Sequence, residues 1–235
     1  MPIAKLDALR RLTAALALAA VALPACGGDH DDPTTAAQRP PATELVASLG
    51  DSITAGTPRW DPNPGIRAQI GSQLDRRSQY GYWAERHLPG TSFRNCGGPG
   101  ERTDEIARRL DTCTRGADAL IVQGGVNDLA AGIEPTEAAA NLRSIVRAGK
   151  RRGLDVAIVE LLPWNGGYPD AAGEIRQLNR LIGRIARTEG AKLIRWYRVL
   201  EDPARPGRMR LHLTSDNAHP SIEGYRLLGE AVELP

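Results

Sequence analysis

The chain has 235 residues, of which 41% are hydrophobic and 25% charged, as in ordinary globular proteins. This length accommodates one domain with a sizeable core, or at most two small ones. The formal net charge of +2 is too small to indicate a nucleic-acid partner. Arginines far outnumber lysines, but they look scattered along the chain rather than clustered.

Residues 1–25 are predicted to be a secretory signal peptide. A basic start precedes an apolar, alanine-rich run, residues 12–25, which is shorter than the roughly 20 residues needed to span a bilayer. The run ends in Leu-Pro-Ala-Cys-Gly, which resembles a bacterial lipobox in which Cys26 is lipidated. Pro24 is uncommon in that motif, and a plain secreted protein cut near the same place is the alternative. Both alternatives predict export. The lipidated protein is expected in the cell envelope or periplasm, attached to the membrane only through the lipid at Cys26, and the unlipidated protein is expected to be secreted.

Residues 26–43 are polar and rich in proline and glycine, and are predicted to be a flexible tether. The folded domain is therefore expected over residues 44–235. It contains two further cysteines, Cys96 and Cys113. An oxidising compartment would favour a disulfide between them, bracing the segment that they enclose, and two buried free thiols are the alternative.

Short apolar runs alternate with longer helical patterns across the domain. The predicted strands are residues 45–49, 92–96, 119–123, 156–161 and 192–194, and the predicted helices are residues 80–87, 101–110, 135–152, 172–189 and 221–232. Such alternation indicates an α/β fold with a parallel five-stranded sheet between two layers of helices, a three-layer α/β/α arrangement. In open sheets of this kind, sites form beyond the carboxyl ends of the strands. Residues 57–79 show neither the helical nor the strand spacing of apolar residues, and are predicted to be a long polar insertion.

A serine follows the first predicted strand directly, in Gly50-Asp51-Ser52-Ile53-Thr54. The turn would expose the Ser52 hydroxyl at the sheet edge and leave backbone N–H groups free to bind an oxyanion, which suits a nucleophile. A helix N-cap is the alternative.

Two further strands end in glycine-rich turns. The second runs into Cys96-Gly97-Gly98-Pro99-Gly100-Glu101, where an N–H at the head of the next helix could donate to a negative charge. The third ends before Asn127, whose amide could serve as an oxyanion donor. Read separately, each is better explained as a tight turn or a cap than as an oxyanion donor.

An Asp-x-x-His motif, Asp216 to His219, stands near the C-terminus. The carboxylate could fix the imidazole tautomer and leave the other ring nitrogen free to accept a serine proton. A surface turn or half of a metal site are the alternatives. Among competing histidines, His30 lies in the tether, His87 in a predicted helix, and His212 where a short strand would use it structurally.

Together these motifs resemble the blocks of the SGNH, or GDSL, hydrolase family over about residues 44–232. The resemblance implies a flavodoxin-like sheet and ester hydrolysis through an acyl-enzyme, with Ser52, His219 and Asp216 as the triad. It also implies an oxyanion hole from the Ser52 N–H, the Gly100 N–H and the Asn127 amide. The second block departs from the family pattern, so Gly98 is an alternative donor to Gly100; Pro99 has no N–H.

The expected substrate is a small-molecule ester or an envelope glycan or lipid ester. Trp60, Trp164 and Tyr168 lie in loops that could overhang the site and contact it. No cofactor, metal or nucleic-acid partner is expected, and the protein is expected to be a monomer. A thioesterase or acyltransferase with the same triad, and a non-catalytic envelope ligand-binding protein, are the alternative functions.

Overall fold

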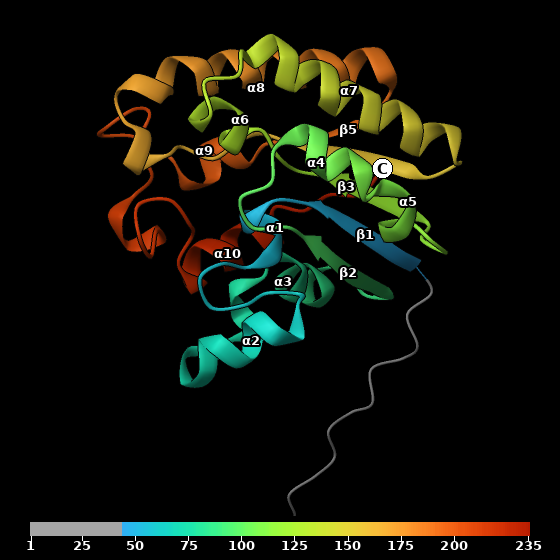
Figure 1. The fold of residues 1–235 in the computed structure, drawn as a ribbon, viewed down its shortest axis with the longest axis horizontal. Helices are drawn as coiled ribbons and strands as arrows, with labels where there is room; N and C mark the ends of the chain where they lie inside the picture. Colours follow the sequence, from blue (N-terminus) through green and yellow to red (C-terminus); the bar gives the residue numbers. More distant parts are fainter. Residues whose placement is uncertain (1–43) are drawn as a thin grey trace, which may run out of the picture. The chain divides into compact units, whose positions relative to one another are not determined.

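The computed structural model describes residues 44–235, which form an α/β domain around one parallel sheet (Figure 1). The expected signal peptide, tether and lipidation site at Cys26 lie outside these residues. The sheet has the order β2-β1-β3-β4-β5. Its strands are β1 (Glu44–Gly50), β2 (Thr91–Gly97), β3 (Ala119–Val122), β4 (Asp155–Val159) and β5 (Lys192–Ile194). The five predicted strands are therefore confirmed, each within one or two residues at most of its bounds.

The strand order places the carboxyl end of β1 at a topological switch. The chain passes from β1 to β2 on one side and then returns to β3 on the other. Loops that leave β1 and β3 diverge at such a point, and open sheets bind ligands in the crevice between them. Gly50 at the end of β1 pairs with Gly97 at the end of β2, so both turns begin at the same level of the sheet.

Helices cover both faces of the sheet, which confirms the three-layer prediction (Figure 1). One face packs against α4 (Thr103–Arg108), α5 (Leu110–Cys113), α7 (Pro135–Arg151) and α8 (Asp170–Glu189). The other packs against α3 (Tyr80–His87), α9 (Trp196–Leu200) and α10 (Ile222–Glu230). No helix in residues 44–235 is both long enough and apolar enough to cross a membrane.

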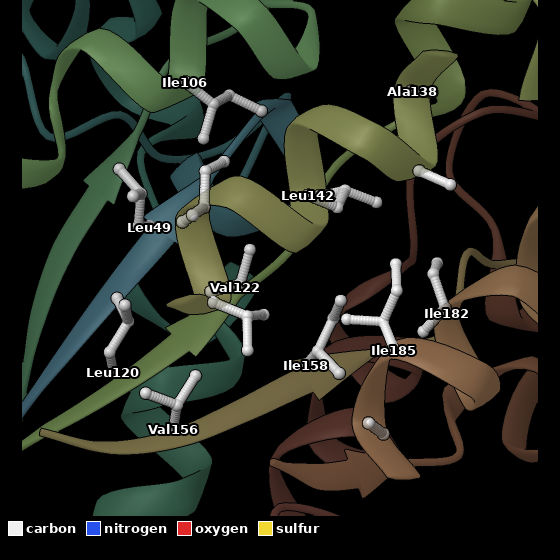
Figure 2. Packing of buried hydrophobic residues seen from close by; sticks show 14 of the residues in the cluster. Leu49, Ile106, Leu120, Val122, Ala138, Leu142, Val156, Ile158, Ile182 and Ile185 are labelled. Carbon is white, nitrogen blue, oxygen red and sulfur yellow. The ribbon is translucent and has the colours of Figure 1, made fainter. Parts of the chain in front are cut away.

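Side chains that alternate along the central strands build the two halves of the core. Leu120, Val122, Val156 and Ile158 lie between the sheet and the helices that carry Leu142 and Ile182 (Figure 2). The intervening residues Ala119, Ile121, Ala157 and Val159 belong to the opposite core. Successive side chains of a strand point to opposite faces, so a strand buried on both sides reads as the continuous apolar run seen in the sequence.

The predicted helix over residues 101–110 is wrong in its continuity. The structure has two short helices, α4 and α5, separated at Arg109. Outside residues 57–79, three further helices were not predicted: α1 (Ser52–Ala55), α6 (Val126–Ala130) and α9. Each has only four or five residues, too few to display a helical period.

The insertion over residues 57–79 is more ordered than its sequence indicates. It contains α2 (Pro64–Ile70) and two 3₁₀ turns, η1 (Gly71–Gln73) and η2 (Arg76–Ser78). Asn63 caps α2 by accepting from the N–H of Gly65, but no residue of α2 is buried, so there is no apolar stripe to read. The remaining 3₁₀ turns are η3 (Asn165–Gly167) and η4 (Leu211–Leu213).

Candidate active site

Ser52 is the first residue of α1 and follows β1 after a single residue. The turn is capped by Asp51, whose carboxylate accepts from the N–H of Ile53 at 2.9 Å. Gly50 makes the tight turn sterically feasible, since a Cβ there would lie 2.3 Å from Thr54 Oγ1. Ser52 itself is 8% exposed, so its hydroxyl is held by the turn yet still reachable.

His219 and Asp216 complete a hydrogen-bonded line that ends at Ser52. His219 Nε2 lies 3.0 Å from Ser52 Oγ, and His219 Nδ1 lies 2.7 Å from Asp216 Oδ2. An ionised carboxylate can only accept, so Nδ1 carries the proton and Nε2 is left to accept from the hydroxyl. The line therefore has the geometry needed to activate a serine hydroxyl.

The loop that carries Asp216 and His219 is fixed by its own hydrogen bonds. Asp216 Oδ1 accepts from the backbone N–H groups of His219, at 2.7 Å, and of Ala218, at 3.0 Å. Asn217 takes a left-handed φ of 68°, which asparagine tolerates better than most residues. Burial acts to raise the pKa of Asp216, but the hydrogen bonds from His219 and Ala218 outweigh it and lower the pKa below its ordinary value. The carboxylate thus stays ionised beside the imidazole.

The glycine-rich turn after β2 supplies a candidate oxyanion donor. Residues 98–101 form a turn closed by the Glu101 N–H bonding to Gly98 O at 3.1 Å. Pro99 precedes Gly100, which has φ 80°, as a type II turn requires. The Gly98 N–H already donates to Gly50 O at 2.9 Å. Within residues 44–235 the N–H groups of Gly100 and Ser52 donate to no protein acceptor, which favours Gly100 over Gly98 as the donor.

Asn127 lies in α6, just beyond β3, and contacts the same turn. Its Nδ2 donates one hydrogen to Glu101 O at 2.8 Å, and the second amide hydrogen remains for a ligand. The next residue, Asp128, is buried and accepts from the Thr103 N–H at 3.0 Å and from Thr103 Oγ1 at 2.5 Å. The turns that leave β2 and β3 are therefore bonded to each other.

Arg109 joins the turns that leave β1 and β2. Its Nη2 donates to Gly50 O at 3.0 Å and its Nη1 donates to Cys96 O at 2.7 Å. It also forms an ion pair with Glu101 in the glycine turn, at 2.5 Å. No motif marks Arg109 in the sequence, because its role depends on contacts between distant elements.

Gln123 is a second residue that the sequence reading missed. It is buried at the end of β3, and its Oε1 accepts from the Asp51 N–H at 3.1 Å and from Thr54 Oγ1 at 2.9 Å. The turn that carries Ser52 is therefore held from the neighbouring strand. The only sequence feature that could have indicated this contact is the polar residue Gln123 at the end of an otherwise apolar predicted strand.

Of the three loop aromatics, the structure brings only Trp164 to the site. A small cavity of about 20 Å³ adjoins the residues next to Ser52 and His219, and its lining includes Ile53, Ala218 and Trp164. Trp60 instead stacks on Arg67 beside a separate cavity of about 300 Å³ under the insertion. Tyr168 is exposed and stacks on Arg208.

The other histidines of the domain lie away from this line of hydrogen bonds. His87 is exposed at the end of α3. His212 is also exposed and lies in η4, so the short strand expected there is wrong. Within residues 44–235, no group of three or more histidine, cysteine, aspartate or glutamate side chains could hold a metal ion.

Comparison with known proteins gives consistent results. The model of the GDSL-like lipase/acylhydrolase family matches residues 48–227. No curated protein sequence matches the chain significantly.

Several solved structures share the fold. One is a member of the lipolytic protein G-D-S-L family from Veillonella parvula, with 17% identity, 80% of this chain and 94% of the other covered, and a TM-score of 0.63. Another is a GDSL-like lipase from Bacteroides thetaiotaomicron, with 18% identity, coverage of 79% and 84%, and a TM-score of 0.62. A third is an acetylxylan esterase from Geobacillus stearothermophilus, with 18% identity, coverage of 82% and 94%, and a TM-score of 0.62. Because the family model matches most of the domain, the chain belongs to the GDSL-like lipase/acylhydrolase family and is a hydrolase.

Proposed function

We propose that the protein is a serine esterase in which Ser52, His219 and Asp216 act as a catalytic triad. The observation that carries the proposal is the line of hydrogen bonds from Asp216 through His219 to Ser52 Oγ, with distances of 2.7 Å and 3.0 Å. Membership of a lipase/acylhydrolase family supports ester hydrolysis as the reaction.

In the proposed mechanism, Ser52 Oγ attacks the ester carbonyl carbon while His219 Nε2 takes the hydroxyl proton. The imidazolium, held by Asp216, returns this proton to the departing alkoxide, which leaves as an alcohol. Water then attacks the acyl-enzyme by the same route, and the acid is released with Ser52 regenerated. The N–H groups of Ser52 and Gly100 and the Asn127 amide stabilise the negative charge on the carbonyl oxygen in both steps.

The cavity beside the site supports a preference for short acyl chains. Its volume is about 20 Å³, and its lining includes Leu161, Leu162 and Trp164. A space this small holds about one water-sized group, so it fits the methyl group of an acetyl ester. An octanoyl chain would have to displace well-packed side chains, at a cost of about 1–3 kcal/mol. The similarity in fold to an acetylxylan esterase also supports this preference.

The test compares hydrolysis of p-nitrophenyl acetate, butyrate and octanoate by the purified protein and by its Ser52→Ala variant. Turnover should vanish in the variant, and kcat/KM for the acetate should exceed that for the octanoate by about tenfold. Trp164→Ala should enlarge the cavity and raise the relative rate on octanoate. Activity that survives Ser52→Ala would exclude Ser52 as the nucleophile. Acyl transfer to an added alcohol in place of acid release would identify an acyltransferase.

We also propose that the protein is exported and anchored by a lipid at Cys26. The basic and apolar pattern of residues 1–25 supports export, as does the disulfide between Cys96 and Cys113, a bond typical of oxidising compartments. In cells, the protein should partition into detergent, while Cys26→Ser should remain in the aqueous phase. Equal partitioning of the two forms would contradict lipidation.

A further inference from the structure

The arginines that look scattered in the sequence gather in one groove on the surface. The groove has a volume of about 720 Å³ and is lined by α8, β5, α9 and the residues between them. We name it the arginine groove after the six exposed arginines that line it: Arg176, Arg180, Arg184, Arg187, Arg195 and Arg198.

The spacing of four of these arginines follows from the helix that carries them. Positions 176, 180, 184 and 187 are separated by four, four and three residues, so they lie on one face of α8. The rise of a helix places successive members about 4.5 to 6 Å apart along its axis. The opposite face is apolar and carries Ile175, Leu178 and Ile182 into the core. The row is therefore held straight by a packed helix.

Most of the charge in the groove is not neutralised by the protein. Within residues 44–235, Arg195 is the one member that forms an ion pair, with Glu160 at 3.6 Å. Glu160 and Glu201 are the two carboxylates in the lining, so six guanidinium groups leave a formal surplus of four positive charges. Elsewhere on α7 and α8 the arrangement differs, since Arg143 and Arg147 both pair with Glu189.

The shape and lining of the groove narrow the class of ligand. The guanidinium group is planar and binds phosphate oxygens in pairs, so an array of them fits a series of phosphates. A membrane-docking surface would present large apolar side chains, but the exposed ones in the described residues, Ile66, Leu74, Tyr168 and Leu211, do not line the groove. The one aromatic residue in the lining is Tyr197, which offers little for stacking nucleotide bases.

We propose that the arginine groove is a binding site for a linear, phosphate-bearing polyanion that lies along α8. Neither Ser52 nor His219 lines the groove, although Glu160 lines both the groove and the small cavity beside Ser52. The proposal does not depend on the proposed esterase mechanism. The polymer would bring negative charges into register with the guanidinium groups and release its counterions on binding.

The test measures binding of fluorescently labelled long-chain inorganic polyphosphate to the purified full chain by anisotropy, over a range of salt concentrations. A groove variant combines Arg180→Gln, Arg184→Gln and Arg187→Gln. A matched control combines Arg59→Gln, Arg115→Gln and Arg151→Gln, which are exposed arginines with no ion pair in residues 44–235 and none in the groove. Both variants lose the same charge.

Wild type and control should bind, and the groove variant should bind about tenfold or more weakly, with the slope of log Kd against log salt reduced by about two. The groove variant should unfold in urea at the same midpoint as the control variant, which verifies its fold independently of the proposed esterase activity. Its hydrolysis of p-nitrophenyl acetate should also be unchanged. Equal losses in both triple variants, or no binding by wild type, would overturn the proposal. So would tighter binding to oligothymidylate than to polyphosphate, or binding to phosphatidylglycerol vesicles without binding to the polymer.

Discussion

At the scale of single residues, Asp51 stabilises the turn that carries Ser52 as its cap but destabilises the fold as a buried carboxylate. Its carboxylate caps the turn that carries Ser52, yet it is fully buried and its Oδ2 has no hydrogen-bond partner. Burial raises the pKa of Asp51 from 3.8 to about 6, although the hydrogen bond from the Ile53 N–H opposes the change. The turn that positions the proposed nucleophile Ser52 therefore carries a carboxylate whose ionisation opposes folding.

We predict that Asp51→Asn stabilises the protein at high pH. Below about pH 4 the acid is protonated in both folded and unfolded states and costs nothing. As the pH rises from about 4 to about 6, the unfolded state ionises while the buried carboxyl of the folded state keeps its proton. The free energy of unfolding therefore falls across this window, and the loss is complete above about pH 6. Raising the pKa from 3.8 to about 6 corresponds to about 3 kcal/mol. Asparagine stays neutral, so urea unfolding should show the variant gaining about 3 kcal/mol on wild type between about pH 4 and pH 8.

Asp170→Asn is the control, because Asp170 is exposed at the start of α8. Its unfolding free energy should follow that of wild type across the same range. Parallel curves for wild type and Asp51→Asn would contradict the prediction.

At the same scale, Asn127 is expected to act on the transition state more than on the fold. Loss of one oxyanion donor costs about a hundredfold to a thousandfold in turnover, so Asn127→Ala should lower kcat for p-nitrophenyl acetate by that factor. Its hydrogen bond to Glu101 O should contribute only about 1 kcal/mol to stability. Asn141→Ala is the matched control, since Asn141 donates to Thr103 Oγ1 nearby and has no part in the proposed mechanism. Near-normal kcat in Asn127→Ala would remove Asn127 from the mechanism.

At the scale of elements, Arg109 is predicted to position the turns that leave β1 and β2. It stands at the break between α4 and α5 and donates to Gly50 O, Cys96 O and the Glu101 carboxylate. Hydrogen bonds to charged groups contribute about 1.5–3 kcal/mol each, and they are not additive. Arg109→Ala should therefore lower the free energy of unfolding by about 3 kcal/mol and reduce kcat more than it raises KM.

The adjacent residue provides the control for this prediction. Arg108 is 70% exposed and pairs with Asp104 on the surface of α4, so Arg108→Ala should cost less than about 1 kcal/mol. Arg109→Lys retains the charge but lacks the planar fork, and should restore part of the stability and little of kcat. Equal effects of the two alanine variants would exclude a specific role for Arg109.

Elements differ in how well their sequences predict them, and the difference has a physical cause. The helices α7 and α8 were predicted within one or two residues because each has a long apolar stripe that the sheet buries. The helix α2 has no buried residue and therefore no such stripe. The single-turn helices are set by tertiary contacts instead of propensity.

In the candidate site, too, local contacts can be predicted from the sequence and long-range contacts cannot. Asp216 and His219 lie three residues apart on one loop, so local spacing is enough to suggest that they meet. Arg109 and Gln123 contact residues 59 and 72 positions away, and no local pattern encodes such contacts. The arginine groove lies between these cases, because the spacing on α8 is visible in the sequence but the contribution of Arg195 and Arg198 depends on the fold.

For the molecule as a whole, the disulfide between Cys96 and Cys113 is expected to raise the free energy of global unfolding. It joins the end of β2 to α5 across 17 residues, on either side of the glycine turn, which settles the pairing left open by the sequence. Closing a loop of this length restricts the unfolded chain by about 3 kcal/mol. The double variant Cys96→Ala and Cys113→Ala should unfold in urea with a free energy about 3 kcal/mol below that of wild type.

Alanine is the suitable replacement because Cys113 is buried, and a serine hydroxyl there would add a separate desolvation cost. Dithiothreitol should lower the stability of wild type toward that of the double variant, since reduction removes the same restriction. It should leave the double variant unchanged, which separates loss of the bond from loss of the two sulfur atoms in the core. Wild-type protein that unfolds identically with and without the reductant would show that this bond does not contribute to stability, and the rigidity of the glycine turn would then have to come from Arg109 and Asp128.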